Sequence, residues 1–169
     1  TPAGGVHYFF RHPGEGKVLQ SCIDPAVVDE RDPMQTDASL DMYREENGFR
    51  PPPEDSRYAP EFVARFRAAQ TARVARIDAL ARSMIRDARE AEHAYEASEG
   101  KLSFAERQAI GRRAAFEPVM VVYRTMANLH YTDRSLDPSN RSYGSLFSDR
   151  PDLMNFQYIG FGRIVTPAA

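Results

Sequence analysis

The stretch from Pro60 to Ser98 constrains the fold more than any other part of the chain, because its interior contains no glycine and no proline. Alanine, arginine, leucine, methionine and glutamate dominate it, and these residues lose little on entering a helix. Its apolar residues recur at spacings of mostly three and four, which draws one apolar stripe along a helix. They are Phe62, Phe66, Val74, Ile77, Leu80, Met84, Ala88, Ala91 and Tyr95. The stretch therefore predicts a helix about 55 Å long, which crosses the protein or projects from it.

A second helix is predicted to fold back along the first. Ser103 and Glu106 form a Ser-x-x-Glu capping box that marks its start. Pro118 is expected to kink this helix or to begin a new one, because proline cannot continue the hydrogen-bond ladder. The segment after Pro118 is apolar enough to be mostly buried. The sequence thus predicts a long antiparallel hairpin of residues 60–98 against 103–129.

The remaining elements are short. Residues 6–10 and 158–165 are β-branched and aromatic enough to predict one strand near each end. Aspartate followed by proline, as at positions 24 and 32, is typical of a helix start, so we expect helical turns at 25–30 and 38–44. Two strands alone do not make a stable sheet. We therefore expect the partner strands to come from sequence outside this chain.

Composition excludes several classes of protein. The net charge of -2 gives no overall attraction to nucleic acid, and no apolar run approaches the ~20 residues of a membrane span. The single cysteine rules out an internal disulfide and favours a reducing compartment, so a cytoplasmic location is expected. The 20 arginines against two lysines suggest a GC-rich bacterial origin.

The sequence contains only weakly supported candidates for a catalytic nucleophile or a metal ligand. Ser145 follows Gly144 but lacks the second glycine of a nucleophile elbow, so a loop serine is the better interpretation. Cys22 lies near His12 and could form a nucleophilic pair, but its place on an apolar helical stripe favours an inert core thiol. His12 is the best of the four histidines, with a pocket-wall or capping role preferred over a catalytic one. No spacing fits a metal site, and no cofactor is expected.

The long helix also carries many arginines. A basic helix can bind phosphate backbones, but acidic residues alternate with the arginines, and Asp78 and Arg82 are spaced for an ion pair. We therefore expect a solvated face carrying ion pairs, without nucleic acid as a partner. The arginines are Arg65, Arg67, Arg73, Arg76, Arg82, Arg86 and Arg89.

Several short segments together resemble the middle of a bacterial family of α/β-hydrolase-fold enzymes. The resemblance lies in the order of the segments and in their general residue pattern, and together they cover most of the chain. They are residues 12–17 (HPGEGK), 23–30 (IDPAVVDE), 40–43 (LDMY), 47–52 (NGFRPP), 57–58 (RY), 66–70 (FRAAQ), 142–147 (SYGSLF) and 160–163 (GFGR).

The resemblance implies an α/β-hydrolase-like fragment, predominantly a helical cap with a long helix hairpin and two sheet strands near the ends. Residues 1–23 would be a strand and turn of the hydrolase core, 24–150 the cap or lid, and 151–169 the return to the core sheet. The catalytic triad would lie outside this chain, so no catalytic residue is assigned within it. The whole enzyme would be a serine-type hydrolase of small ester or amide substrates. Its predicted pocket wall consists of His12, Tyr143, Phe147, Phe156 and Tyr158.

A non-enzymatic alternative remains open. The helical hairpin could be an interaction or oligomerisation module that docks a partner helix or a second copy of the chain. In the hydrolase interpretation, the corresponding partner is the rest of its own core or a second copy. No membrane partner is expected in either case.

Overall fold

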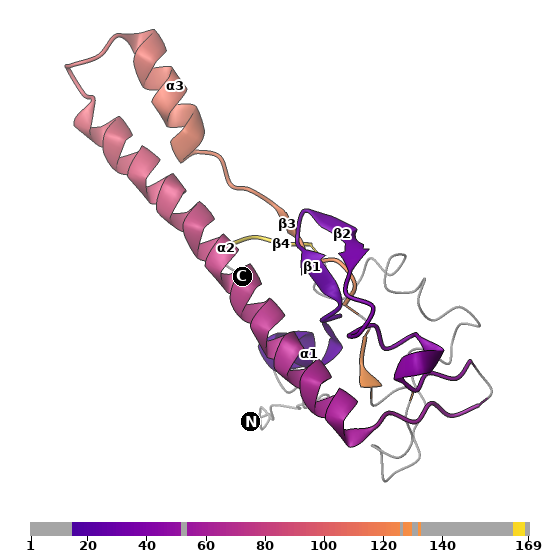
Figure 1. The fold of residues 1–169 in the computed structure, drawn as a ribbon. Helices are drawn as coiled ribbons and strands as arrows, with labels where there is room; N and C mark the ends of the chain where they lie inside the picture. Colours follow the sequence, from indigo (N-terminus) through magenta and orange to yellow (C-terminus); the bar gives the residue numbers. More distant parts are fainter. Residues whose placement is uncertain (1–14, 52–53, 126, 130–131, 133–163, 168–169) are drawn as a thin grey trace, which may run out of the picture.

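The computed structural model describes residues 15–51, 54–125, 127–129, 132 and 164–167, and this part of the chain is predominantly helical (Figure 1). The predicted strand at 6–10 and residues 158–163 of the second predicted strand lie outside the described residues. The elements are α1 (Glu15–Cys22), β1 (Val27–Asp29), β2 (Asp32–Thr36), η1 (Glu45–Asn47), α2 (Pro60–Ala97), α3 (Phe104–Ala114), β3 (Met120–Val121) and β4 (Ile164–Val165).

The long helix is confirmed almost to the residue. α2 spans 38 residues, or about 57 Å, and Pro60 occupies its first turn, where a missing N–H costs nothing. Its first half lies against α1 and the loops of the chain. We call this body of α1 and the loops the base. The far half of α2 projects, and α3 runs back antiparallel to it (Figure 1). We call α2 and α3 together the arm.

The predicted start of the second helix is also confirmed. The Ser103 hydroxyl accepts a hydrogen bond from the Glu106 N–H, and the Glu106 carboxylate accepts one from the Ser103 N–H at 2.9 Å. The predicted length is wrong, because α3 ends at Ala114, well before residue 129. Pro118 neither kinks a helix nor begins one.

The chain after Pro118 is extended. Met120 and Val122 are buried while Val119 and Val121 are exposed, which is the alternation of a strand. The backbone hydrogen bonds explain this conformation, because they go to the base and not to a helical turn. The Asp24 N–H donates to the Arg124 carbonyl at 2.7 Å. The segment was expected to be mostly buried, and this is confirmed, since Val119 and Val121 are the only exposed side chains among its described residues.

The prediction of a helical turn at 25–30 is wrong, because these residues begin an antiparallel β-hairpin of β1 and β2. The Asp24 carboxylate does accept a backbone hydrogen bond, from the Ala26 N–H at 2.9 Å. This bond closes a tight turn around Pro25, and β-branched Val27 and Val28 then continue as a strand. Asp-Pro is therefore a turn here and not a helix start.

The same turn recurs along the chain. The side chains of Asp29, Asp32, Asp37 and Asp41 each accept a hydrogen bond from the backbone N–H two residues later, at 2.8–3.1 Å. Such turns compete with helix formation. The helical turn predicted at 38–44 is accordingly displaced to η1, a single 3-10 turn at 45–47. Gly48 ends it in the left-handed region with φ 112°.

The apolar core lies where the start of α2 meets the base. Its buried residues are Met42, Tyr58, Phe62, Phe66, Ala127 and Leu129. The Tyr58 and Phe62 rings stack at 5.4 Å, and the Tyr58 hydroxyl donates to the Met42 carbonyl at 3.0 Å. Burying each of these large side chains stabilises the fold by about 1.5–3 kcal/mol. The core therefore fixes one end of α2 and leaves the other end without comparable support.

The second ladder is shorter. β3 pairs antiparallel with β4, so that Met120 lies opposite Val165 and Val121 opposite Ile164. Within the described residues, both ladders contain two strands each.

Candidate functional site

The pocket wall predicted from the resemblance lies outside the described residues. This applies to all five of its members, His12, Tyr143, Phe147, Phe156 and Tyr158, and to Ser145. Their roles stay predictions. The described residues do contain two arrangements that the sequence did not predict, a buried ionic cluster in the base and an apolar hollow on the arm.

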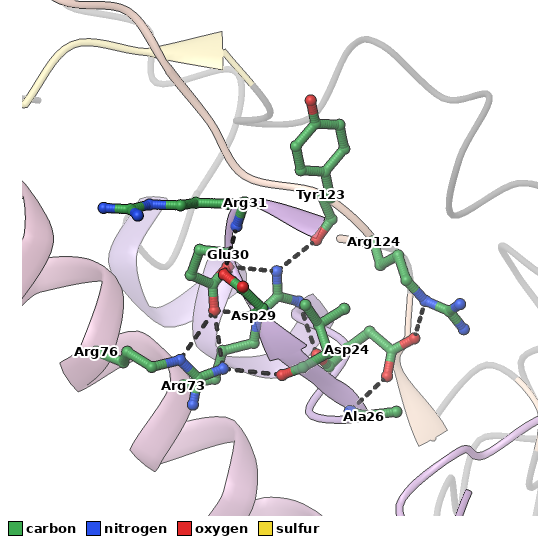
Figure 2. Close-up of polar contacts among 10 residues, drawn as sticks. Asp24, Ala26, Asp29, Glu30, Arg31, Arg73, Arg76, Tyr123 and Arg124 are labelled. Carbon is green, nitrogen blue, oxygen red and sulfur yellow. Dashed lines mark hydrogen bonds and ion pairs between the residues drawn. The ribbon is translucent and has the colours of Figure 1, made fainter. Parts of the chain in front are cut away.

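Arg73 is at the centre of the ionic cluster (Figure 2). It lies on α2 with a fully buried side chain, and its guanidinium contacts the Glu30 carboxylate at 2.8, 3.0 and 3.2 Å. It also donates to the carbonyls of Asp24 at 2.7 Å and Tyr123 at 2.9 Å. One side chain thus joins the long helix, the β-hairpin and the extended segment after Pro118.

Arg76 completes the contact with the hairpin. Its guanidinium donates to the Glu30 carboxylate at 2.8 Å and to the Val27 carbonyl at 2.8 Å. The Glu30 side chain is only 10% exposed, and two arginines balance its charge. A buried carboxylate needs such compensation, since an unpaired charge in the interior costs several kcal/mol.

A second buried pair lies beside the first. Arg124 donates to the carboxylate of Asp24, which is completely buried. Burial raises the pKa of the Asp24 carboxyl, while the Arg124 guanidinium and the Ala26 N–H act in the opposite direction. Arg124 has φ 54°, which costs a residue with a Cβ about 1–2 kcal/mol. The ion pair and the hydrogen bond from the Asp24 N–H hold this conformation.

Gln70 links the same segments through neutral hydrogen bonds. Its side-chain amide donates to the Ser21 carbonyl at 3.1 Å and the Ile23 carbonyl at 3.0 Å. The polar groups of Arg73, Glu30 and Asp24 are bonded within the cluster, which leaves none of them directed toward a substrate. The cluster is therefore a structural anchor for the arm.

The sequence contained a signal for this anchor. Gln70 and Arg73 fall on the apolar stripe of α2, at the spacings of three and four that join Phe66 to Ile77. A polar residue on such a stripe is a candidate buried partner. The other six arginines of α2 are exposed, as predicted, and Arg82 pairs with Asp78 at 2.7 Å.

Cys22 has the environment of an inert thiol. It is 3% exposed at the end of α1, as the helical stripe predicted. Burial raises the pKa of the Cys22 thiol, and the hydrogen bonds with Ser21 and Asn128 oppose this effect only in part. A raised pKa lowers the thiolate fraction, which is the nucleophilic form.

The apolar hollow lies where the chain leaves α3 and passes over α2. Two neighbouring depressions, of about 300 and about 450 Å³, share Met84, Ala88, Phe116 and Pro118. We call these four residues the arm groove. Phe116 is 66% exposed and Val119, just beyond the groove, is 63% exposed. Contiguous exposed apolar surface, unlike a single exposed side chain, is a candidate binding surface.

Charged residues surround the arm groove. Arg89, Arg112 and Arg113 are on its rim together with Asp87, Glu92 and Glu117. Among the described residues, no cluster of histidine, cysteine, aspartate or glutamate could hold a metal ion. In the same part of the chain, no helix has the length and apolarity of a membrane span.

Comparison of the chain with protein-family models, curated proteins and solved structures gave no match.

Proposed function

We propose that this chain is the lid-bearing part of a serine-type hydrolase with an α/β-hydrolase-like core. In this proposal, the arm covers the active site and the arm groove contacts the acyl or alcohol group of a small ester or amide substrate. The observation that supports it most is the exposed apolar surface around Phe116, because small-molecule pockets are lined mainly by apolar and aromatic side chains.

The way the arm is attached also supports a lid. The base holds the start of α2 through the apolar core and through Arg73. In contrast, no residue of α2 from Val74 to Ala88 is buried. An element that is fixed at one end and loosely packed along its length can move as a unit about its attachment.

The two-stranded ladders are consistent with a place in a larger sheet. A single two-stranded ladder is marginally stable in water, and additional strands or a helical cover stabilise it. In this proposal, residues 1–23 and 151–169 contribute to the core and 24–150 form the lid. The predicted pocket wall of His12, Tyr143, Phe147, Phe156 and Tyr158 would meet the arm groove across the substrate, in a bacterial cytoplasmic enzyme.

The test compares the chain alone with the chain extended by the residues that flank it in its gene. We expect the extended protein to cleave p-nitrophenyl butyrate and to be labelled by a fluorophosphonate, which reacts with activated serines. We expect neither reaction from the chain alone. An extended protein that shows neither cleavage nor labelling would contradict the proposal.

A second assay tests the role of the arm groove itself. Phe116→Ala should raise KM for long-chain p-nitrophenyl esters by about tenfold and leave short-chain esters little changed, because it removes an apolar contact. Met34→Ala is the matched control, since Met34 is equally exposed but lies on β2. Equal effects of the two substitutions would exclude the groove as a substrate contact.

The non-enzymatic alternative is favoured by a different observation. The exposed arm has an acidic end and a basic middle, which suits association with another helical surface. An interaction module predicts a concentration-dependent oligomer and no turnover at either chain length. The ester assay on the extended protein separates the two functions, because only the hydrolase turns substrate over.

A further inference from the structure

The charges of the arm are divided along its length. The part of α2 from Arg65 to Arg89, which we call the stem, contains seven arginines and two aspartates. The segment from Glu90 to Glu106, which we call the tip, contains five glutamates and one lysine, and Arg107 lies beside it with its guanidinium over the Tyr95 ring. Six of the stem arginines and all five tip glutamates are exposed, so the division is a surface property.

α3 strengthens this division. It runs antiparallel to α2, so its last residues return to the level of Met84 and Ala88. Arg112 and Arg113 therefore add positive charge beside the stem and not beside the tip. The arm groove lies at the boundary between the basic and the acidic part.

We propose that the arm associates with the arm of a second copy of this chain, in antiparallel orientation. A two-fold axis near the arm groove would place each acidic tip against the basic stem of the other copy, as an isologous interface requires. The same axis would bring Phe116 of both copies together and remove them from water. Charge complementarity and apolar contact thus select the same partner and the same orientation.

The expected contacts can be named. With the axis near the groove, Glu92 and Glu96 of one copy lie opposite Arg89 and Arg112 of the other, both on the groove rim, and the symmetry repeats this contact. Exposed ion pairs are individually weak, so the apolar centre supplies affinity and the charges supply orientation. The dimer and the proposed substrate contact both use Phe116, so in the hydrolase proposal self-association would close the arm groove to substrate.

The experiment is sedimentation velocity on the whole chain over about a hundredfold range of concentration, in about 0.1 M and about 1 M salt. We expect a monomer–dimer equilibrium that weakens at high salt. Phe116→Asp should weaken it further, whereas Met34→Asp, on an equally exposed apolar residue of β2, should leave it unchanged. A monomer at every concentration would overturn the proposal.

Charge reversal tests the orientation. The tip variant Glu92→Arg/Glu96→Arg and the stem-side variant Arg89→Glu/Arg112→Glu should each weaken self-association by about tenfold or more, because like charges then meet twice per dimer. An equimolar mixture of the two variants should dimerise again, as each tip regains a stem of opposite charge. This recovery also excludes misfolding as the cause of the loss. A dimer that neither reversal weakens, or a mixture that stays monomeric, would exclude the antiparallel arrangement.

Discussion

Arg73, on the long helix, and Glu30, at the turn of the β1–β2 hairpin, form a buried pair across 43 positions of sequence. Three guanidinium–carboxylate contacts of 2.8–3.2 Å join them, and the guanidinium also bonds two backbone carbonyls. Planar arginine is suited to this role, since its fixed donors match a carboxylate and carbonyls simultaneously. The pair connects the projecting arm to the base.

Replacing Arg73 should therefore destabilise the whole fold. Arg73→Met leaves Glu30 buried with only Arg76 to balance its charge, and we expect the free energy of unfolding to fall by about 3–5 kcal/mol. Urea denaturation followed by circular dichroism measures the change.

Arg82→Met is the control, because Arg82 lies on the same helix in an exposed pair with Asp78. Its expected cost is below about 0.5 kcal/mol. Similar costs for the two substitutions would mean that the Arg73 cluster is not an anchor.

Gly48 should tolerate no side chain. A Cβ at this position would lie 2.1 Å from the Arg57 carbonyl oxygen, and φ is 112°. Gly48→Ala should therefore cost more than about 2 kcal/mol, since the backbone of both segments must shift. Thermal and urea denaturation measure the loss.

Gly16→Ala provides the matched substitution. No atom lies within 4 Å of its added Cβ, and Gly16 is in helix α1. Alanine there should be neutral or stabilising by up to about 1 kcal/mol. A destabilisation equal to that of Gly48→Ala would contradict the geometry at the end of η1.

The capping box of α3 should make the helicity of the arm depend on pH. Hydrogen bonds from Ser103 hold the pKa of the Glu106 carboxyl below its ordinary value. Because the folded pKa is lowered, the stabilisation is complete above about pH 4.3, the value for free glutamate, and is lost as pH falls through the folded pKa. Far-UV circular dichroism during acid titration should show this loss.

Glu106→Gln is the comparison for this titration. Glutamine can still bond the Ser103 N–H, but it has no charge to lose. The variant should be less stable than the native chain at neutral pH and equal to it at low pH. A difference that persists unchanged to low pH would exclude the carboxylate as the cause.

Cys22 should react slowly with thiol reagents in the native state. Burial raises its thiol pKa and also excludes the reagent. Labelling with a chromogenic disulfide at neutral pH should be much slower than that of a free cysteine, and it should reach the free rate in denaturant. Native labelling at the free rate would restore Cys22 as a candidate nucleophile.

Local interactions explain what the sequence predicted correctly. The long helix follows from an uninterrupted run of good helix formers, and the capping box from two residues three apart. The i,i+4 pair of Asp78 and Arg82 belongs to the same class. Each depends on neighbours within one or two turns, so sequence spacing alone specifies it.

The candidate site could not be predicted from local sequence spacing. The arm groove requires the chain after α3 to cross α2 at Met84 and Ala88, whereas we predicted from the sequence that this segment is helical. The residues of the predicted pocket wall lie outside the described part of the chain. The basic stem and the acidic tip were present in the sequence, but only the position of α3 relates them to an exposed apolar surface.

Asp24 illustrates what the tertiary structure alone decided. Its Asp-Pro pair suits a helix start and a turn equally well. The choice depends on Arg124, a hundred residues later, which donates a hydrogen bond to the Asp24 carboxylate. The burial of Arg73 was likewise decided by the tertiary structure. An arginine on a helix is usually exposed, and this one is buried because Glu30 and two backbone carbonyls accept its hydrogen bonds. The sequence by itself determined the long helix and the capped start of α3, through contacts between near neighbours. The tertiary structure decided which charges are buried, because that depends on partners far away along the chain.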